Sequence, residues 1–243
     1  MPWLVTDFDT DEILEAEGDI DARWSPCSTF KIPLALMGFD SGILHDAKNP
    51  VWPFAANYEA RVPVMLESWR QSFDPMGWMH HSCLWYSQVI TETLGAEKFA
   101  HYLREFDYGN GDISGDPGKN NGLTNSWLVS SLQISPREQV QFLRRLLLLQ
   151  LPVSESALAK TAPLIFAGDL AGGRMFGKTG SGYTDRAAGK QRGWFIGWCE
   201  RGQRRLLFAA LVDHEGPGFA GHRARALMTD VLEKLVSNSE DVG

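Results

Sequence analysis

The two-residue alternation of apolar and polar side chains that is typical of β-strands lies near both ends of the chain. The predicted strands are 2–8, 12–17, 173–181, 193–200 and 204–213. Only a few residues separate the first two segments, and the same is true of the last two, so each pair is a predicted hairpin. Because strands joined by a hairpin pair antiparallel, the pattern predicts one antiparallel layer built from both ends of the chain.

The middle of the chain has helical periodicity instead. The predicted helices are 77–95, 96–106 and 135–149, and an amphipathic helix, 222–236, closes the chain. Ser135 and Glu138 form a capping-box pattern, with Pro136 at the first helical position. The polar, glycine-rich segment 107–122 is predicted to be a loop, and loops of that length are uncommon and often functional.

A further helix is predicted to begin near Ser25. Ser25-Pro26 is a typical helix start, with serine as the cap and proline in the first turn. Pro33 lacks the amide that would bond to the Thr29 carbonyl. The sequence therefore predicts either a kink or a helix that begins near Ser28.

Together these elements predict a single α+β domain over residues 1–243. Its α/β part is discontinuous, at about 1–44 and 172–243, and a helical part at about 45–171 is inserted between the two pieces. A chain of 243 residues with 44% hydrophobic residues can bury a sizeable core.

The composition argues against several kinds of partner. A formal net charge of −7 is unfavourable for nucleic acid, because phosphate binding needs a basic face. No apolar run approaches the roughly 20 residues of a membrane span. Residues 1–14 have neither the basic nor the apolar region of a signal peptide, which leaves open a cytosolic location or the removal of a preceding segment.

No metal site is expected from the candidate ligands. The cysteines lack C-x-x-C spacing and are expected to be small buried residues. The N-terminal aspartates lack the glycine and the final glutamate of a calcium loop, and the adjacent histidines point to different helix faces. These residues are Cys27, Cys83 and Cys199; Asp7, Asp9 and Asp11; and His80 and His81.

The segment GGRMFGKT, 172–179, matches the pattern of a phosphate-binding loop. Such a loop must lead into a helix whose amides hold the phosphate. Gly180, Gly182 and Gly189 follow it instead, which disfavours a helix. A nucleotide-binding enzyme is therefore only a minor alternative.

Ser28 and Lys31 are the strongest candidates for catalysis. Their spacing places both side chains on one face of a helix, and the residues that follow Lys31 are mostly apolar. Burial lowers the pKa of a lysine by up to about 3–5 units. A neutral amine beside a hydroxyl is a base beside a nucleophile.

This S-x-x-K pair is the first of seven ordered motifs. They are SPCSTFK, WMHHSCLWYSQ, FDYGN, NNGLTNSWL, ISP, GKTGSGYT and GWFIGW. Together they resemble the class D (oxacillinase-type) serine β-lactamases of the penicillin-recognising superfamily, and YGN with KTG points to class D within it. The resemblance implies an antiparallel β-sheet flanked by terminal helices plus an all-helical subdomain.

The resemblance also implies a role for each motif residue. Ser28 would attack the lactam carbonyl, Lys31 would accept the serine proton, and Ser82 would pass a proton to the leaving nitrogen. Lys178 is the fourth predicted catalytic residue. Together with Thr179 it would hold the substrate carboxylate. The backbone amides of Ser28 and Ser181 would form the oxyanion hole. The implied substrate-binding residues are Thr179, Gly180, Ser181, Leu84 and Arg223.

Leu84 stands where related serine enzymes carry an asparagine. Leucine excludes water, and a dry site favours an uncharged Lys31 amine, which can add CO2. The resemblance implies this N-carboxylation of Lys31 and no other cofactor, with the Trp127 indole N–H as a donor to the new group. Tyr108 and Asn110 carry the YGN motif at the start of the long loop, where they serve either the site or a simple turn.

Several points stay open at this stage. The family usually has valine in place of Leu84, so the rate of deacylation is not fixed by the resemblance. The arginine that binds the substrate carboxylate is Arg223 or Arg225. A penicillin-binding sensor domain that is acylated but deacylates slowly is the alternative function. The resemblance implies a periplasmic or secreted protein with a small β-lactam as its partner, and a homodimer is left open.

Overall fold

The structure, a computed structural model, describes residues 1–170 and 172–237. The strands are β1 (Trp3–Asp7), β2 (Ile13–Glu17), β3 (Phe166–Leu170), β4 (Gly173–Asp185), β5 (Lys190–Arg201) and β6 (Arg204–Glu215). The α-helices are α1 (Lys31–Asp40), α2 (Pro75–His81), α3 (Leu84–Glu105), α4 (Gly122–Asn125), α5 (Pro136–Leu147), α6 (Glu155–Leu164) and α7 (Ala220–Ser237). Three 3-10 helices are η1 (Cys27–Phe30), η2 (Ala56–Arg61) and η3 (Glu67–Trp69).

The six strands form one sheet in the order β2-β1-β6-β5-β4-β3, and all neighbours are antiparallel. β1 pairs with β6, so that Trp3 lies opposite Ala210. The predicted antiparallel layer from both ends of the chain, with its two hairpins, is therefore confirmed. The sequence pattern did not predict β3, which lies inside the segment assigned to the helical part. The division of the domain into two parts stays a prediction.

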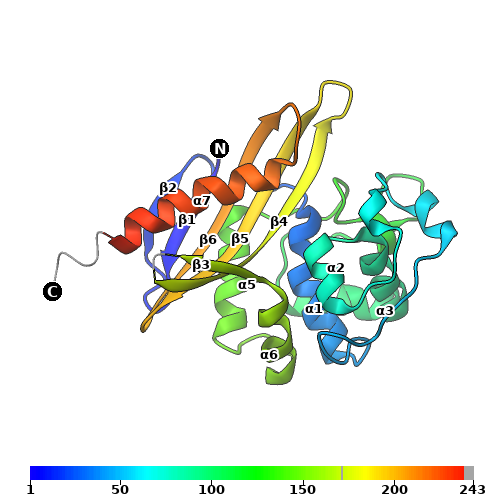
Figure 1. Cartoon of the computed structure of the whole chain (residues 1–243), viewed down its shortest axis with the longest axis horizontal. Coiled ribbons are helices and arrows are strands. Elements are labelled where there is room, and N and C mark those ends of the chain that lie inside the picture. The colour runs from blue at the N-terminus through cyan, green and yellow to red at the C-terminus, as the bar shows by residue number, and fades with distance from the viewer. Residues whose placement is uncertain (171, 238–243) are drawn as a thin grey trace.

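Side-chain alternation along the strands gives the sheet two buried faces. On one face, residues such as Val5 and Phe208 pack under α7, which contributes Ala224, Met228 and Leu232. On the other face, the sheet packs with α1, α3, α5 and α6 in a larger core. Figure 1 shows α7 crossing one side of the sheet and α5 lying behind it, with α1, α2 and α3 beside the edge that carries β4.

Two helices replace the single helix predicted at 77–95. α2 ends at His81, and Ser82 takes a left-handed backbone conformation with φ 54° before α3 begins at Leu84. The prediction that Ser82 lies within a helix was therefore wrong, because the apolar periodicity continues across the break. Gly95, the predicted stop, interrupts α3 with φ 75° and ψ 164°.

Local sequence signals at two helix starts are confirmed. Ser135 Oγ accepts a bond of 3.2 Å from the Glu138 amide, and the Glu138 carboxylate accepts one of 2.8 Å from the Ser135 amide. η1 precedes α1, so helical structure begins near Ser28. This confirms the prediction of a helix start there rather than a kink at Pro33. Pro33 lies in the first turn of α1, where its missing amide breaks no helical hydrogen bond.

The lysine of the segment GGRMFGKT lies within β4, and the chain continues as a strand to Asp185. Because a strand and not a helix follows that lysine, this segment lacks the geometry of a phosphate-binding loop. Among the helices of residues 1–170 and 172–237, none has the length and apolar character needed to cross a bilayer.

The close approach of α7 to the sheet generates a prediction about Gly193. A Cβ at Gly193 would lie 2.0 Å from the carbonyl carbon of Ala220 and 2.2 Å from the amide nitrogen of Gly221. We expect Gly193→Ala to lower the free energy of unfolding in urea by at least about 3 kcal/mol, since helix backbone must move. Gly42→Ala is the control, because its Cβ meets open space and costs only about 1–2 kcal/mol of left-handed backbone strain. Equal losses would contradict this explanation.

Candidate active site

A tight helical turn brings Ser28 and Lys31 together. Ser28 lies in η1, and Lys31 is the first residue of α1. Side chains three residues apart eclipse each other in a 3-10 turn, so both point into the same space. Lys31 Nζ and Ser28 Oγ are 3.3 Å apart and share a hydrogen bond. This is the geometry of a base beside a nucleophile.

The Lys31 amine is enclosed by the protein, with 1% of the residue exposed. Burial lowers the pKa of Lys31 well below its ordinary value, and the positive charge of Lys178 lowers it further. Burial also raises the pKa of the Cys27 and Cys83 thiols to about 12. These thiols are therefore uncharged at neutral pH and give a Lys31 cation no counter-charge, which leaves the neutral amine as the favoured form.

Trp127 closes the site from the loop that precedes α5. Its ring is fully buried and stacks on Phe30, with ring centroids 5.4 Å apart. Its carbonyl accepts hydrogen bonds from Ser25 Oγ at 2.7 Å and from the Cys27 amide at 2.9 Å, which ties the loop to the segment that carries the nucleophile. Within the described residues the indole N–H has no hydrogen-bond acceptor, so it is available to a group placed in the site.

The edge of β4 faces η1. β3 pairs with β4 only as far as Phe176, and the Gly177 amide then donates to the Ile165 carbonyl at 2.8 Å. Because backbone groups alternate sides along a strand, the Ser181 amide points to the same, now open, edge. A Cβ at Gly180 would lie 3.0 Å from the Ser28 amide nitrogen, so η1 and β4 are in close contact there. The arrangement fits an oxyanion hole formed by the amides of Ser28 and Ser181.

Lys178 faces the same space from β4. It is 7% exposed, and its Nζ donates a hydrogen bond of 3.1 Å to the Thr179 carbonyl. Burial lowers the pKa of Lys178 to about 8. It therefore remains largely cationic at neutral pH and can hold a substrate carboxylate.

Ser82 and Leu84 lie at the junction of α2 and α3. The left-handed conformation of Ser82 turns it out of both helices, and its hydroxyl makes no hydrogen bond to any residue that the structure describes. The neighbouring Cys83 thiol is near enough to affect the pKa of Lys31, which places this junction beside the base. Leu84 is 7% exposed and offers no hydrogen-bonding group in place of an asparagine.

The YGN residues support the site from behind. Tyr108 is buried, and its hydroxyl donates to Gln139 Oε1 at 3.4 Å. Gln139 Nε2 in turn donates to Thr29 Oγ1 at 3.2 Å, which connects α5 to η1. Asn110 is exposed and bonds the main chain of residues 112, 131 and 133, so it holds the long loop in place. The sequence analysis missed Gln139. The only available signal was a polar residue on the apolar face of the predicted helix, in line with Phe142, Leu143 and Leu146.

The start of α7 lies against β4, where the Gly221 amide donates to Ser181 Oγ at 2.9 Å. Arg225 lies one helical turn after Gly221 on the same face, and its guanidinium donates to the Ala167 carbonyl of β3. Arg223 is rotated by about 200° from Gly221, and it is exposed without a hydrogen bond or ion pair to any described residue. The geometry thus brings Arg225, rather than Arg223, to the face that covers β4, although the role of either arginine stays a prediction.

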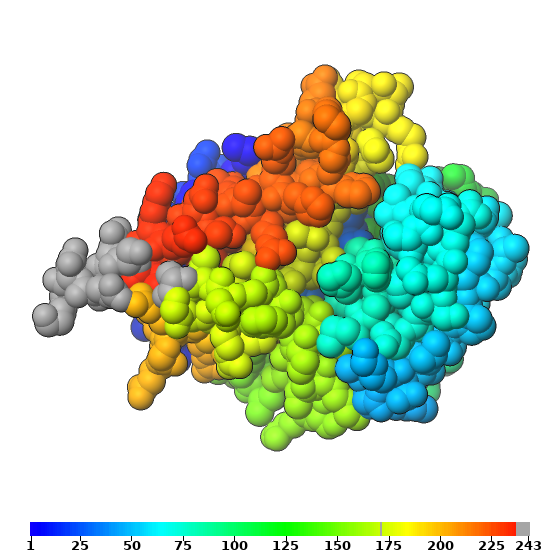
Figure 2. Space-filling view, in the orientation of Figure 1, coloured from blue at the N-terminus to red at the C-terminus, as the bar shows by residue number. Residues whose placement is uncertain are grey.

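A hollow opens on the surface beside β4. In Figure 2 it lies between the yellow strand region and the cyan segment, and blue atoms of the early part of the chain form its floor.

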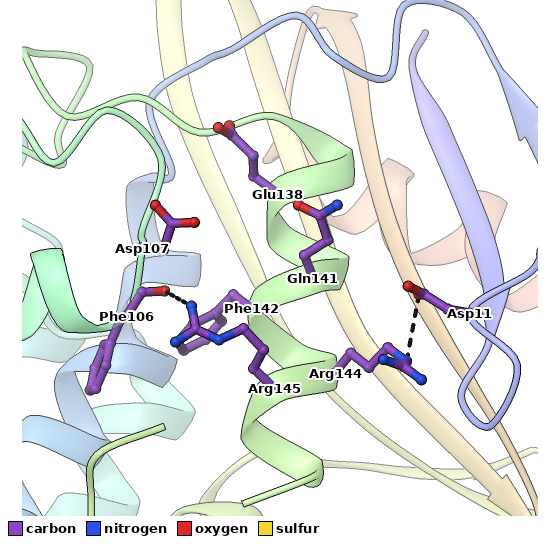
Figure 3. A pocket seen from close by; sticks show the side chains of 8 residues that line it. All are labelled: Asp11, Phe106, Asp107, Glu138, Gln141, Phe142, Arg144 and Arg145. Carbon is purple, nitrogen blue, oxygen red and sulfur yellow. Dashed lines mark hydrogen bonds and ion pairs between the residues drawn. The ribbon is translucent and has the colours of Figure 1, made fainter. Parts of the chain in front are cut away.

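A separate pocket of 250 Å³ lies at α5 (Figure 3), lined by Asp11, Phe106, Asp107, Glu138, Gln141, Phe142, Arg144 and Arg145. Its arginines already bind the protein, Arg144 to Asp11 at 3.5 Å and Arg145 to the Phe106 carbonyl at 3.0 Å. This pocket contains none of the predicted site residues.

Comparison with known proteins identifies the class. Residues 4–233 match the sequence profile of the penicillin binding protein transpeptidase domain. Together with the paired serine and lysine on η1 and α1, this match defines a penicillin-recognising serine enzyme domain.

Individual relatives narrow the family further. The β-lactamase OXA-9 of Klebsiella pneumoniae is 44% identical over 216 residues, which are 86% of this chain and 77% of OXA-9. The β-lactamase OXA-1 of Escherichia coli is 41% identical over 197 residues, 80% of this chain and 68% of OXA-1. The crystal structure of the OXA-427 class D β-lactamase has a TM-score of 0.89 at 43% identity and covers 98% of both chains. The chain therefore belongs to the class D serine β-lactamases, which confirms both the resemblance and the predicted fold class.

The pKa of Lys178 generates a prediction about pH dependence. As the pH rises through about 8, Lys178 loses the charge that would hold the substrate carboxylate, so kcat/KM for a penicillin should fall. Lys178→Arg keeps its charge and should move this alkaline limb upward by more than about one pH unit. The exposed Lys190→Arg is the matched control. An unchanged limb in Lys178→Arg would show that another group titrates there.

The placement of the two arginines generates a second prediction. Removing a charge-assisted contact to the substrate carboxylate should raise KM for a penicillin about tenfold in Arg225→Ala. Arg223→Ala, on the other side of the same helix, is the control and should leave KM within about twofold of the parent value. A larger effect of Arg223→Ala than of Arg225→Ala would reverse the assignment.

Proposed function

We propose that this chain hydrolyses β-lactam antibiotics through an acyl-enzyme on Ser28, with an N-carboxylated Lys31 as the base. The observation that carries the proposal is the buried amine of Lys31, 3.3 Å from Ser28 Oγ and without a counter-charge. A serine hydroxyl is a weak nucleophile, and an adjacent base is what activates it.

Acylation uses groups from η1, α1, the junction of α2 and α3, and β4. Ser28 Oγ forms a bond to the lactam carbonyl carbon while its proton passes to the base at Lys31. The carbon–nitrogen bond of the ring then breaks, and Ser82 delivers a proton to the departing nitrogen. The developing oxyanion is stabilised by the amides of Ser28 and Ser181, each worth about 2.7–4 kcal/mol in comparable sites. Lys178 and Thr179 hold the substrate carboxylate.

The surroundings of Lys31 fit N-carboxylation. CO2 reacts only with a neutral amine, and burial favours that form of Lys31. The Trp127 N–H supplies a donor that no described residue uses, and Leu84 helps to exclude water from the new charge. When present, the carboxylate on Lys31 supplies a stronger base, both for the serine proton and for the water that releases the product.

A slowly deacylating penicillin sensor is the alternative function. Both functions use the same Ser28 and Lys31, so the fold does not separate them. The similarity to the β-lactamases OXA-9 and OXA-1 over most of the chain favours hydrolysis. We further propose a periplasmic or secreted location, which the resemblance to this family supports.

The bicarbonate dependence of turnover tests the proposed base. We expect nitrocefin turnover at pH 7 to rise with added bicarbonate, because the modification is reversible and needs CO2. Lys31→Ala should still be acylated slowly, and mass spectrometry should detect an adduct on Ser28 that persists, since no base activates water. Lys160→Ala on α6 is the control and should hydrolyse the adduct as the parent does.

Two outcomes would contradict the proposal. Turnover that is independent of bicarbonate, with an unmodified Lys31 by ¹³C NMR, would remove the carboxylated base. A stable adduct in the parent protein would favour the sensor instead.

A further inference from the structure

Val129 combines two unfavourable features beside the active site. It is a β-branched residue with a left-handed backbone, φ 56°, and its side chain is 40% exposed. β-branched residues rarely adopt this conformation, and it persists only where surrounding contacts enforce it. Leu149, with φ 57° and 53% exposure, is the other aliphatic residue in this state among the described positions, and it lies two residues after the end of α5.

Two linked hydrogen bonds enforce the conformation of Val129. Its amide donates to Ser25 Oγ at 2.8 Å, and the Ser25 hydroxyl donates to the Trp127 carbonyl at 2.7 Å. Ser25 is 2% exposed and lies three residues before the nucleophile. The backbone at Val129 is thus fixed to the segment that carries Ser28, while its side chain is left at the surface.

The side chain lies over the edge of β4. A Cβ at Gly182 would be 2.4 Å from Val129 Cγ2 and 2.8 Å from Cys27 Sγ. Gly180, which faces the Ser28 amide, precedes Gly182 by two residues on the same face of the strand. Two residues of a strand span roughly 7 Å. The valine methyl groups therefore lie about one such step along β4 from the point where the Ser28 amide meets the strand, in the direction away from Lys178.

We propose that Val129 contacts the acyl side chain of the bound lactam and favours substrates in which that side chain is apolar. The inference rests on the proposed function, which places the substrate carboxylate at Lys178 and Thr179 and the lactam carbonyl at Ser181. The acylamino group lies on the opposite side of that carbonyl from the carboxylate, so it extends along β4 toward Gly182. There it meets an exposed aliphatic surface that the backbone holds in place.

The test compares two penicillins that differ only in this group, benzylpenicillin and 6-aminopenicillanic acid. The measured quantity is the ratio of their second-order rate constants for acylation of Ser28. We expect Val129→Gly to lower this ratio about fivefold, because the apolar contact is lost. Val129→Asn, which tolerates a left-handed backbone and keeps a side chain of similar size, should lower it by a similar factor.

Leu149→Gly is the matched control, since it relieves the same backbone strain far from the site. Both glycine variants should keep or raise the melting temperature, but only Val129→Gly should change the ratio. A parent-like ratio in Val129→Gly and Val129→Asn, with Ser28 still acylated, overturns this inference alone. The absence of any Ser28 adduct in the parent protein overturns the proposed function as well.

Discussion

The cost of keeping a charge on Lys31 beside Ser28 governs the construction of the site. A buried amine must either gain a counter-charge or lose its proton. No carboxylate among the described residues forms an ion pair with Lys31, and the neighbouring Lys178 adds repulsion. Lys178 is buried too, but it donates to the Thr179 carbonyl and has a pKa of about 8. Burial therefore opposes the charge on both lysines, but only the Lys31 amine is also repelled by a second cation in the site, so the neutral form is favoured more strongly at Lys31.

Enclosing that amine requires backbone conformations that local preference disfavours. Cys27, Ser82 and Val129 have φ values of 50°, 54° and 56°, and they lie in the three segments that border the Ser28–Lys31 pair. Left-handed residues other than glycine cost about 1–2 kcal/mol each. Gly180 and Gly182 supply the complementary feature, because any side chain there would strike the segment at Cys27 and Ser28. The strain is local, whereas the packing that offsets it is spread over both cores of the domain.

Features that depend on local periodicity were predictable from the sequence, and features that depend on distant contacts were not. The hairpins and the capping box at Ser135 follow from nearby residues alone. β3 was missed because it is short, contains Gly168, and is held by pairing with β4. α6 was missed because it is short and contains Pro163 near its end. The break at Ser82 was missed because apolar residues continue on both sides of it.

The residues of the candidate site divide in the same way, into those predictable from local spacing and those that depend on distant contacts. Ser28 and Lys31 could be identified because a fixed spacing in a helical turn brings them together. The residues that orient them come from distant segments, and their buried hydrogen bonds leave no periodic trace in the sequence. Gln139 of α5, for example, donates a hydrogen bond to Thr29 of η1, 110 positions earlier in the chain. The choice between Arg223 and Arg225 was likewise beyond what the sequence pattern could decide. That choice depends on where α7 begins its first turn, and sequence patterns fix helix ends poorly.

Ser28 lies where the sheet and the helices meet. Hydrogen bonds from β5 and from α5 hold the residues on either side of it. The Trp194 indole of β5 donates to the Ser25 carbonyl at 2.9 Å, and Gln139 of α5 donates to Thr29 Oγ1 at 3.2 Å. Ser28 can therefore move relative to the β4 edge only if core packing is disrupted, which favours a preorganised acylation step. In the proposed cycle, Leu84 would limit water at the base and Val129 would contact the substrate, and neither residue holds the nucleophile in position. Substitutions at those two positions can alter deacylation and substrate preference while the serine, the lysine and the edge strand stay in place.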